Sequence, residues 1–538
     1  MREILMGTYL NPGNSGFWTI RNDTYVDKTG LISYINDTIN TPRKLTCFSR
    51  PRRFGKSFAA KMLCAYYDKC CDSGALFEGL EISKADSYSK YLNQFDVIYL
   101  DITRFISLAT NIKTVVRDIQ DHVIEELRAK YPTCIKKDEQ NLADTLLKVC
   151  QQTNEPFIMI IDEWDALFRE AKENHPLQVE YIQFLRGLFK AGPATDKTIA
   201  AAYMTGILPI KKYGTQSALT DFREFTMTNP AKLAQYVGFT EPEVQNLCSE
   251  FQMDFESMKI WYDGYSFSRV SHVYSPNSVM NAVQNEEFRA YWSSSETYES
   301  LKNYITEDFD GLKDAIVQML GGQHIHVDTM TFQNDMTSFK SRDDVITLLI
   351  HLGYLAYDST KDEVFIPNRE VASAFRSAIK GSSWTEVNKA LSQSEKLLKA
   401  TLCGDTETVA ELLELAHEAC ASSLEYNDEN SLSCAILLAY YTAQNDYEIF
   451  RELPTGKGFA DYAFIPRKNS HKPALLVELK YNHSADSAIR QIHDNRYSGK
   501  LSGLTNEIIL VGINYDKYVK GENKKHHTCI IEKIKTPL

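Results

Sequence analysis

Three residues near the C-terminal end of the chain have the types and spacing of a metal-dependent hydrolytic site. Asp461 lies in one apolar run, and Glu478 and Lys480 lie two positions apart in the next, Ala474–Lys480. Because side chains alternate along a strand, Glu478 and Lys480 share a face, and an antiparallel return can place Asp461 beside Glu478. Two carboxylates so near to each other repel unless a divalent cation such as Mg²⁺ lies between them. The pattern predicts metal-assisted phosphodiester hydrolysis, with Lys480 orienting or activating the attacking water.

Two helical segments flank these strands. The apolar segment Ser431–Ala443 precedes them, and Ala485–Tyr497 follows them and carries Gln491 on the side expected to face the acids. Glu-x-Lys on a single strand is common, so the alternative is a sheet with one charged face in solvent. Because the acid, the hairpin and both helices occur in order, we favour a nuclease-type site.

A second candidate site lies near the start of the chain, in the stretch KLTCFSRPRRFGKS. An apolar run meets a tight basic turn that closes on Gly55, Lys56 and Ser57, and a helix is expected over Phe58–Tyr67. Strand, turn and helix N-terminus together predict a loop that grips a triphosphate. Lys56 would reach the β- and γ-phosphates and Ser57 would ligate magnesium. Arg50 occupies the position of the first glycine of the usual pattern. This departure bears on whether ATP is hydrolysed more than on whether ATP is bound.

The acids that would serve this loop end the most hydrophobic strand of the chain, Phe157–Glu163. Ligands of open α/β sheets bind at the C-terminal ends of strands, so Asp162 is placed to hold magnesium and Glu163 to polarise the attacking water. The alternative is a pair that only caps the following helix; the phosphate loop upstream favours the nucleotide interpretation. For Thr205, at the end of the next strand, a γ-phosphate sensor and a structural residue remain equally open.

Short apolar strands alternate with longer helical segments through the first half of the chain. This alternation predicts a parallel sheet covered by helices, because parallel strands need long crossover connections. The expected strands are the run before Arg50 and residues 97–101, 157–163, 198–205 and 225–228, with helices over 112–129 and 177–190.

The rest of the chain carries no further constellation of catalytic type. His324 and His326 have strand-like spacing, but no third metal ligand lies near them in the sequence, so we expect a structural or solvent-facing pair. The features to which we assign structural roles are a winged-type helix and hairpin over 348–367, a polar amphipathic helix over 382–420, and the surface residues His526, His527 and Cys529.

Composition narrows the class of protein. The 538 residues are 43% hydrophobic, and no apolar run approaches the roughly 20 residues of a membrane span. The start, MREILMGTYLNPG, has no signal-peptide core, and the 11 cysteines form no CxxC, so we expect reduced thiols and a cytoplasmic protein without a membrane partner. The net charge of −12 argues against a nucleic-acid coat, but residues 451–538 hold 15 Lys and Arg against 9 Asp and Glu. Nucleic-acid contact is therefore expected at the C-terminal end.

These motifs together resemble two known families. The segments RPRRFGKS, IIDEWDAL, MTGILPI, YVGFTEPEV, WYDGYSF and VYSPNSV resemble the AAA-ATPase-like domain widespread in anaerobic gut bacteria. The segments GKGFADYAFIPRK, ALLVELKYN and AIRQIHDNRY resemble the PD-(D/E)XK nuclease-superfamily domain usually fused to it. The resemblance covers nearly the whole chain, and its motifs occur in family order.

The resemblance implies ATP and Mg²⁺ as cofactors and assigns roles by residue. The implied nucleotide-site residues are Arg53, Phe54, Gly55, Lys56, Ser57, Asp162 and Glu163, to which our interpretation of the strand ends adds Thr205. The nuclease signature falls on Asp461, Glu478 and Lys480, with Gln491 on the following helix and Glu429 as an extra acid on the preceding one (Glu425 is the less favoured choice). An arginine acting from a second copy would be Arg50, Arg52, Arg53 or Arg223, and the sequence does not choose among them.

The expected fold class is α/β. A P-loop NTPase-type parallel sheet is expected over residues 1–240, a mostly helical middle region with a winged-type element over 241–400, and a restriction-endonuclease-like α/β domain over 401–538. The expected function is an ATP-binding and ATP-hydrolysing bacterial protein that governs a magnesium-dependent nuclease, with DNA favoured over RNA and a homo-oligomer left open. One alternative is a nucleotide-dependent switch whose nuclease fold only binds nucleic acid or protein; another is a decayed phosphate site beside a working nuclease.

Overall fold

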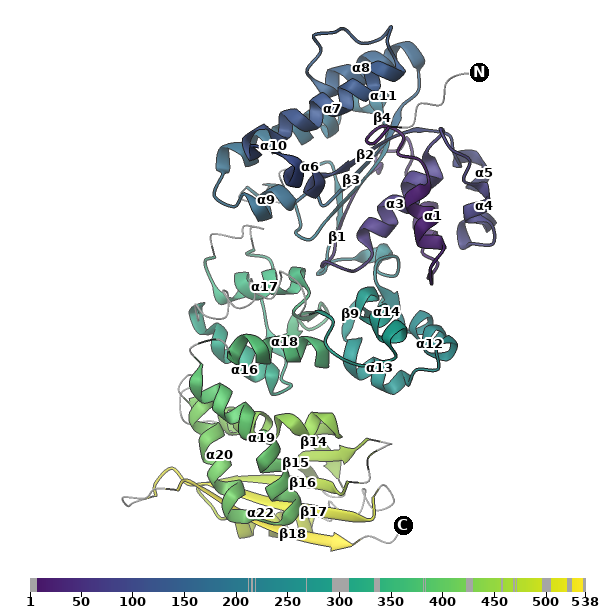
Figure 1. Ribbon diagram of the computed structural model, residues 1–538. Helices are drawn as coiled ribbons and strands as arrows, with labels where there is room; N and C mark the ends of the chain where they lie inside the picture. Colours follow the sequence, from purple (N-terminus) through teal and green to yellow (C-terminus); the bar gives the residue numbers. More distant parts are fainter. Residues whose placement is uncertain are drawn as a thin grey trace. The chain divides into compact units, whose positions relative to one another are not determined.

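The computed structural model describes residues 7–210, 212–213, 216–217, 219–267, 269–292, 309–332, 339–380, 382, 384–421, 429–455, 458–467, 470, 472–495, 505–519 and 525–535. The chain forms two compact units (Figure 1). The first unit is Met1–Thr297 with His326–Val371, and the second is Tyr298–Ile325 with Ala372–Leu538. The three expected domains, with limits near 240 and 400, remain a prediction.

The first unit is built on a five-stranded sheet of order β2-β3-β4-β1-β7, in which every neighbouring pair is parallel. The predicted parallel sheet is thereby confirmed. Its strands are β1 (Leu45–Ser49), β2 (Asp96–Asp101), β3 (Phe157–Asp162), β4 (Ile199–Gly206) and β7 (Arg223–Phe225). The residues of β1, β3 and β4 are all buried, as expected of a parallel sheet covered on both faces.

Helices cover both faces of this sheet (Figure 1). The helices α7 (Val115–Lys130), α8 (Leu142–Thr153) and α10 (His175–Phe189) contribute to one large apolar core. Helix α3 (Lys56–Tyr67) contacts β2, β3 and β4, and α1 (Ser15–Arg21) packs against α3. Shorter elements of this region are α2 (Gly30–Asn36), α4 (Gly74–Phe77), α5 (Tyr88–Tyr91), α6 (Ile102–Leu108), α9 (Ala166–Glu170), α11 (Pro193–Thr198), β5 (Lys212–Tyr213) and β6 (Gln216–Ser217).

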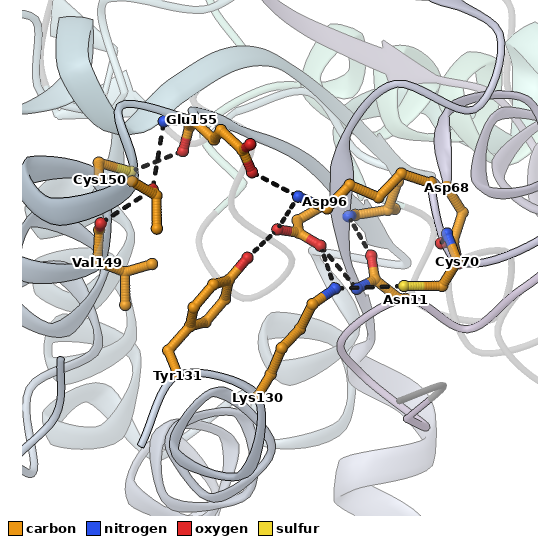
Figure 2. Close-up of polar contacts among 12 residues, drawn as sticks. Asn11, Asp68, Cys70, Asp96, Lys130, Tyr131, Val149, Cys150 and Glu155 are labelled. Atoms are coloured by element: carbon orange, nitrogen blue, oxygen red, sulfur yellow. Dashed lines mark hydrogen bonds and ion pairs between the residues drawn. The ribbon is translucent and has the colours of Figure 1, made fainter. Parts of the chain in front are cut away.

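The N-terminal end of β2 carries a charge network around the buried Asp96 (Figure 2). Asp96 accepts hydrogen bonds from Asn11 Nδ2 at 2.8 Å and from Tyr131, and pairs with Lys130 at 2.5 Å and Lys69 at 2.9 Å. Burial alone would raise the pKa of Asp96, but the two lysines lower it below its ordinary value. This network fastens the segment before α1 to the start of β2, at the opposite end of the sheet from the phosphate loop.

A second lobe of the first unit contains two three-stranded sheets and several helices, and one of these sheets includes β11 (Ile325–His326). The predicted winged-type helix and hairpin are present as α17 (Arg342–Leu352), β12 (Ala356–Asp358) and β13 (Glu363–Phe365), and β12 also contacts β9. The other elements are β8 (Phe239–Thr240), α12 (Glu241–Glu250), α13 (Phe255–Tyr262), β9 (Tyr265–Phe267), β10 (Val270–Tyr274) and α14 (Pro276–Asn285).

The second unit holds a mixed five-stranded sheet in sequential order, antiparallel except for the parallel β16–β17 pair. Its strands are β14 (Tyr447–Thr455), β15 (Gly458–Pro466), β16 (Ala474–Tyr481), β17 (Glu507–Tyr515) and β18 (His527–Lys535). Helix α22 (Ala485–Asp494) connects β16 to β17 and packs on both, burying Ala488, Ile489 and Ile492. The crossover is a helix because parallel neighbours cannot be joined by a tight turn.

Helices α18 (Arg369–Lys380), α19 (Thr385–Cys403), α20 (Thr406–Ala421), α21 (Glu429–Ala439) and α16 (Leu312–Leu320) complete this part of the chain. The single helix predicted over 382–420 is wrong. The structure breaks it at Gly404, whose φ of +87° is the left-handed conformation that ends α19 at low steric cost for glycine.

Candidate functional sites

The phosphate-loop candidate has the predicted strand–turn–helix geometry. Strand β1 ends at Ser49, and α3 begins at Lys56, so the turn between them faces the N-terminus of a 12-residue helix. Arg53 and Gly55 both adopt positive φ, +68° and +89°. Open space surrounds a Cβ built on Gly55, so backbone conformation rather than crowding requires glycine there.

Lys56 is buried and points toward Glu163. Its Nζ donates to the Pro51 carbonyl at 2.9 Å and lies 3.5 Å from Glu163 Oε1. Glu163 also pairs through its other oxygen with Arg169. Burial alone would raise the pKa of Glu163, but Lys56 and then Arg169 lower it below its ordinary value. The Glu163 carboxylate is therefore charged and held from two sides.

Asp162 forms the centre of the second half of this site. It accepts hydrogen bonds from the Thr205 hydroxyl and from the Ser57 side chain. Burial raises the pKa of Asp162, and these two hydrogen bonds oppose that shift. A hydroxyl beside a carboxylate is a set of hard oxygen donors that fits magnesium. The structure thus gathers Ser57, Asp162 and Thr205 as the sequence predicted; their roles in binding nucleotide stay predictions.

Arg50 has a role that the sequence did not reveal. Its side chain is completely buried, with the guanidinium 4.7 Å from the Phe48 ring centre and 4.9 Å from that of Phe267. It donates to the carbonyl oxygens of Ser49 at 3.0 Å and Thr226 at 2.8 Å. Arg50 therefore braces the start of the loop, and its burial removes it from the arginines that could reach a second copy of the chain.

Asp165 and Arg169 were also missed. Asp165 Oδ2 accepts from the backbone N–H groups of Ile207 at 3.1 Å and Leu208 at 2.9 Å, and Arg169 Nε lies 3.2 Å from it. Arg169 thereby bridges Asp165 and Glu163. The signal in the sequence was a third acid following Asp162 and Glu163 with an arginine four positions later, a spacing that one helical turn brings together.

The nuclease-type candidate assembles on β15 and β16. These strands are antiparallel, and the pairing of Tyr462 with Val477 places Asp461 next to Glu478. Asp461 Oδ2 accepts from the Leu479 N–H at 2.7 Å, and Lys480 Nζ lies 3.1 Å from Glu478 Oε1. The structure therefore brings together the three residues that the hairpin argument placed side by side.

Glu478 is the residue that most strongly indicates a cation-binding site. It is 1% exposed, and its Oε2 has no hydrogen-bond partner in the part of the chain that the structure describes. Burial, and then the Asp461 carboxylate, raise the pKa of Glu478 to about 7. A buried, unsatisfied carboxylate oxygen beside a second carboxylate fits a divalent cation, which would supply the missing partner and relieve the repulsion.

The remaining predicted site residues are less well defined. Gln491 is half-buried on α22, and its catalytic role stays a prediction. Glu429 begins α21, while its side chain and all of Glu425 lie outside the described residues. No group of three or more His, Cys, Asp or Glu side chains among the described residues has metal-site geometry by itself. A cation between Asp461 and Glu478 would take further ligands from water, from substrate or from the extra acid predicted at Glu429.

The prediction that His527 is a surface residue is wrong. His527 is 2% exposed; its Nδ1 lies 2.8 Å from Glu414 Oε2 and its Nε2 lies 3.1 Å from His417 Nδ1. Its burial follows from β18 packing against α20, which provides both partners. Nothing close in sequence signals that pairing, because Glu414 and His417 precede it by more than 100 residues.

The raised pKa of Glu478 predicts a pH-dependent response to magnesium. Protonated Glu478 cannot ligate a cation, so magnesium affinity should fall about tenfold for each pH unit below about 7 and level off above it. Thermal unfolding of the full chain with and without Mg²⁺ should show a stabilisation at pH 8 that is largely lost at pH 5.5. Glu478→Gln should remove this pH-dependent part; an unchanged pH profile in that variant would assign the response to another group.

Comparison with known proteins matches two parts of the chain to known families. Residues 13–215 match the family model described as Predicted AAA-ATPase, and residues 428–524 match that of the PD-(D/E)XK nuclease superfamily. The chain joins an AAA-ATPase-like domain to a PD-(D/E)XK nuclease-superfamily domain. The first match contains Lys56, Asp162 and Thr205, and the second contains Asp461 and Glu478.

A curated relative matches along most of its length. It is the "Uncharacterized protein in vnfD 5'region" of Azotobacter chroococcum mcd 1, which is 21% identical over 515 residues, covering 92% of this chain and 93% of that protein. The similarity therefore extends over most of both chains, and the printed name of the relative states no activity.

Two solved structures share limited similarity. The Aeropyrum pernix ORC2 protein (ADPNP-ADP complexes) matches with 11% identity and a TM-score of 0.31, over 67% of this chain and 97% of that one. A DNA replication initiation factor matches with 11% identity and a TM-score of 0.24, over 75% and 98%. TM-scores this low carry no argument about function. Within the described residues, the structure contains no helix that is both long and apolar enough to cross a membrane.

Proposed function

We propose that ATP binding and hydrolysis in the first unit govern a magnesium-dependent phosphodiesterase in the second unit, with DNA as its substrate and the bacterial cytoplasm as its location. The observation that carries the nuclease half is the buried Glu478 Oε2, which lies beside Asp461 and Lys480 and has no hydrogen-bond partner among the described residues. The ATP half is supported by the gathering of Lys56, Ser57 and Asp162. The AAA-ATPase-like and nuclease-superfamily matches support both halves.

In the nuclease half, Asp461 and Glu478 would hold Mg²⁺, and the ion would supply Lewis-acid activation of the phosphodiester. Lys480 lies 3.1 Å from Glu478 Oε1, so its ammonium is held at the edge of the carboxylate pair. From there it can hold the attacking water and support the charge that develops on phosphorus. The excess of Lys and Arg after residue 451 supports binding of a polyanionic substrate in this part of the chain.

In the ATP half, a triphosphate would replace the present partners of Lys56. Its ammonium now contacts the Pro51 carbonyl and Glu163 Oε1, two oxygen acceptors that phosphate oxygens can substitute. Once Lys56 turns to phosphate, Glu163 Oε2 keeps its contact with Arg169, and Oε1, which Lys56 contacts now, can polarise water. Nucleotide binding is thereby coupled to release of the group that we assign to hydrolysis.

The function is tested with purified full-length protein and end-labelled duplex DNA, single-stranded DNA and RNA, each with and without Mg²⁺ and ATP. We expect Mg²⁺-dependent cleavage of DNA whose rate changes with ATP, and its loss in Asp461→Ala. Cleavage that survives Asp461→Ala and Lys480→Ala would reject the nuclease site. The rival is a nucleotide-dependent switch whose nuclease fold only binds nucleic acid or protein; tight nucleic-acid binding without cleavage in Mg²⁺, Mn²⁺ and Ca²⁺ would support that rival.

A further inference from the structure

The phosphate loop is anchored by its own apolar side chains to the second lobe of the first unit. Phe54 is 1% exposed, and its ring packs edge-on against Tyr265 and Trp292, with ring centres 5.4 and 6.2 Å apart. Pro51 lies against Gly353, where an added Cβ would come within 2.7 Å of Pro51 Cγ and 2.9 Å of the Trp292 ring. Phe54 thus contacts Trp292 directly, and Pro51 and Trp292 both pack at Gly353.

A polar path leaves the loop at the same place. Arg53 Nη1 donates to the Tyr291 carbonyl at 3.0 Å. The N–H groups of Tyr291 and Trp292 both donate to Glu370 Oε1, at 2.6 and 2.8 Å. Glu370 is 1% exposed, so this doubly bonded carboxylate is shielded from competing water. Segment 291–292 is thus held by the phosphate loop on one side and by Glu370 on the other.

The chain passes between its units at three points, and two of these lie close in sequence to Trp292 and Glu370. The first crossing, between Thr297 and Tyr298, follows Trp292 by five residues. The second, between Val371 and Ala372, lies one residue beyond Glu370 and falls inside α18 (Arg369–Lys380). The Glu370 carboxylate thereby ties the segment leading to one crossing to the helix that forms the other.

We propose that Glu370 is a positioning residue that transmits the state of the phosphate loop to the start of α18. This inference rests on the proposed nucleotide function. When phosphate oxygens replace the Pro51 carbonyl as the partner of Lys56, the loop adjusts, and Pro51 and Phe54 move Trp292 with them. The two N–H groups on Glu370 then carry the adjustment to the first turn of α18, the helix that continues into the nuclease-bearing unit.

The direct test measures hydrogen exchange of the peptide covering residues 369–380 in the full chain, with and without a non-hydrolysable ATP analogue and Mg²⁺. In the wild type we expect the analogue to change exchange there by about threefold or more. Glu370→Ala removes the acceptor and should reduce that response to background while the analogue still binds. Glu370→Gln keeps one acceptor oxygen and should retain the response, and Glu250→Ala, at an exposed position of α12, is the matched control.

The result that would overturn the proposal is an unchanged nucleotide response in Glu370→Ala, or a wild type that binds the analogue without any change at residues 369–380. If Glu370→Ala fails to fold, Arg53→Ala takes its place, because Arg53 is exposed and its removal breaks the link to the Tyr291 carbonyl. Since Arg53 is also assigned to the nucleotide site, the comparison is made at saturating analogue, where a full response in that variant also overturns the proposal. Calorimetry with ATP distinguishes a failure of this inference from a failure of the proposed function. Absence of ATP binding to the wild type rejects the proposed function itself, and this inference with it.

Discussion

Glu478→Gln is expected to lower the phosphodiesterase rate by about 1,000-fold or more, because the amide cannot serve as an anionic ligand for magnesium. The same change should leave the fold intact and raise its stability in EDTA at pH 8. Glutamine has nearly the same shape but carries no charge, so it relieves the repulsion from Asp461 that helps raise the pKa of Glu478. Cleavage assays and thermal unfolding in EDTA, run side by side, measure the two effects.

The opposite signs of the two effects make this prediction specific. A merely structural Glu478 would lose activity and stability together, and a solvent-facing one would change neither. Glu448→Gln is the matched control, because Glu448 is exposed on β14 of the same sheet. A Glu478→Gln protein that cleaves at the wild-type rate in Mg²⁺ would remove Glu478 from the metal site.

Lys56→Ala is expected to weaken ATP binding by about 100-fold or more, since it removes the buried ammonium that we assign to the β- and γ-phosphates. Isothermal calorimetry of ATP against the wild type and the variant measures the loss. Lys61→Ala is the matched control, because Lys61 lies on the same helix α3 with an exposed side chain. Equal affinities in the Lys56 variant and the wild type would place nucleotide elsewhere or nowhere on the chain.

Glu163→Gln separates binding from hydrolysis at the same site. The variant keeps a side chain of the same size, so ATP binding should stay within about threefold of the wild type, while hydrolysis should fall about 100-fold as the charged base is lost. Single-turnover hydrolysis measured beside calorimetry distinguishes the two. A variant that hydrolyses ATP at the wild-type rate would show that Glu163 only pairs with Lys56 and Arg169.

Local pattern was sufficient for much of the fold and for the residues that lie on strands. The alternation of side chains around Asp461 and Glu478 follows from strand periodicity. The position of Asp162 follows because ligands of parallel sheets bind at the C-terminal ends of the strands. A hairpin of antiparallel strands also predicts which residues face each other. Because these features depend only on residues in one or two adjacent elements, they can be predicted from the sequence.

The contacts that the sequence did not reveal are long-range. Arg50 stacks on Phe267, more than 200 residues later, and Glu370 receives the N–H groups of Tyr291 and Trp292. Nothing in the motif RPRRFGKS indicates that its first arginine, Arg50, is buried and braces the loop, or that Phe54 packs among aromatic rings. Departure from the glycine pattern at Arg50 was visible, but its physical reason lies in a lobe that periodicity alone could not place against the loop.

The segment held by Asp96 has a consequence for association between molecules. Strand β2 is the outermost strand of its sheet, and the chain just before α1 runs antiparallel along its free side, with Asn11 N donating to the Val97 carbonyl and Tyr99 N donating to the Tyr9 carbonyl. It thereby occupies the unpaired backbone groups that would otherwise recruit a strand from another chain. A shortened protein starting at residue 13, where the AAA-ATPase-like match begins, would expose that edge and present a template for aggregation.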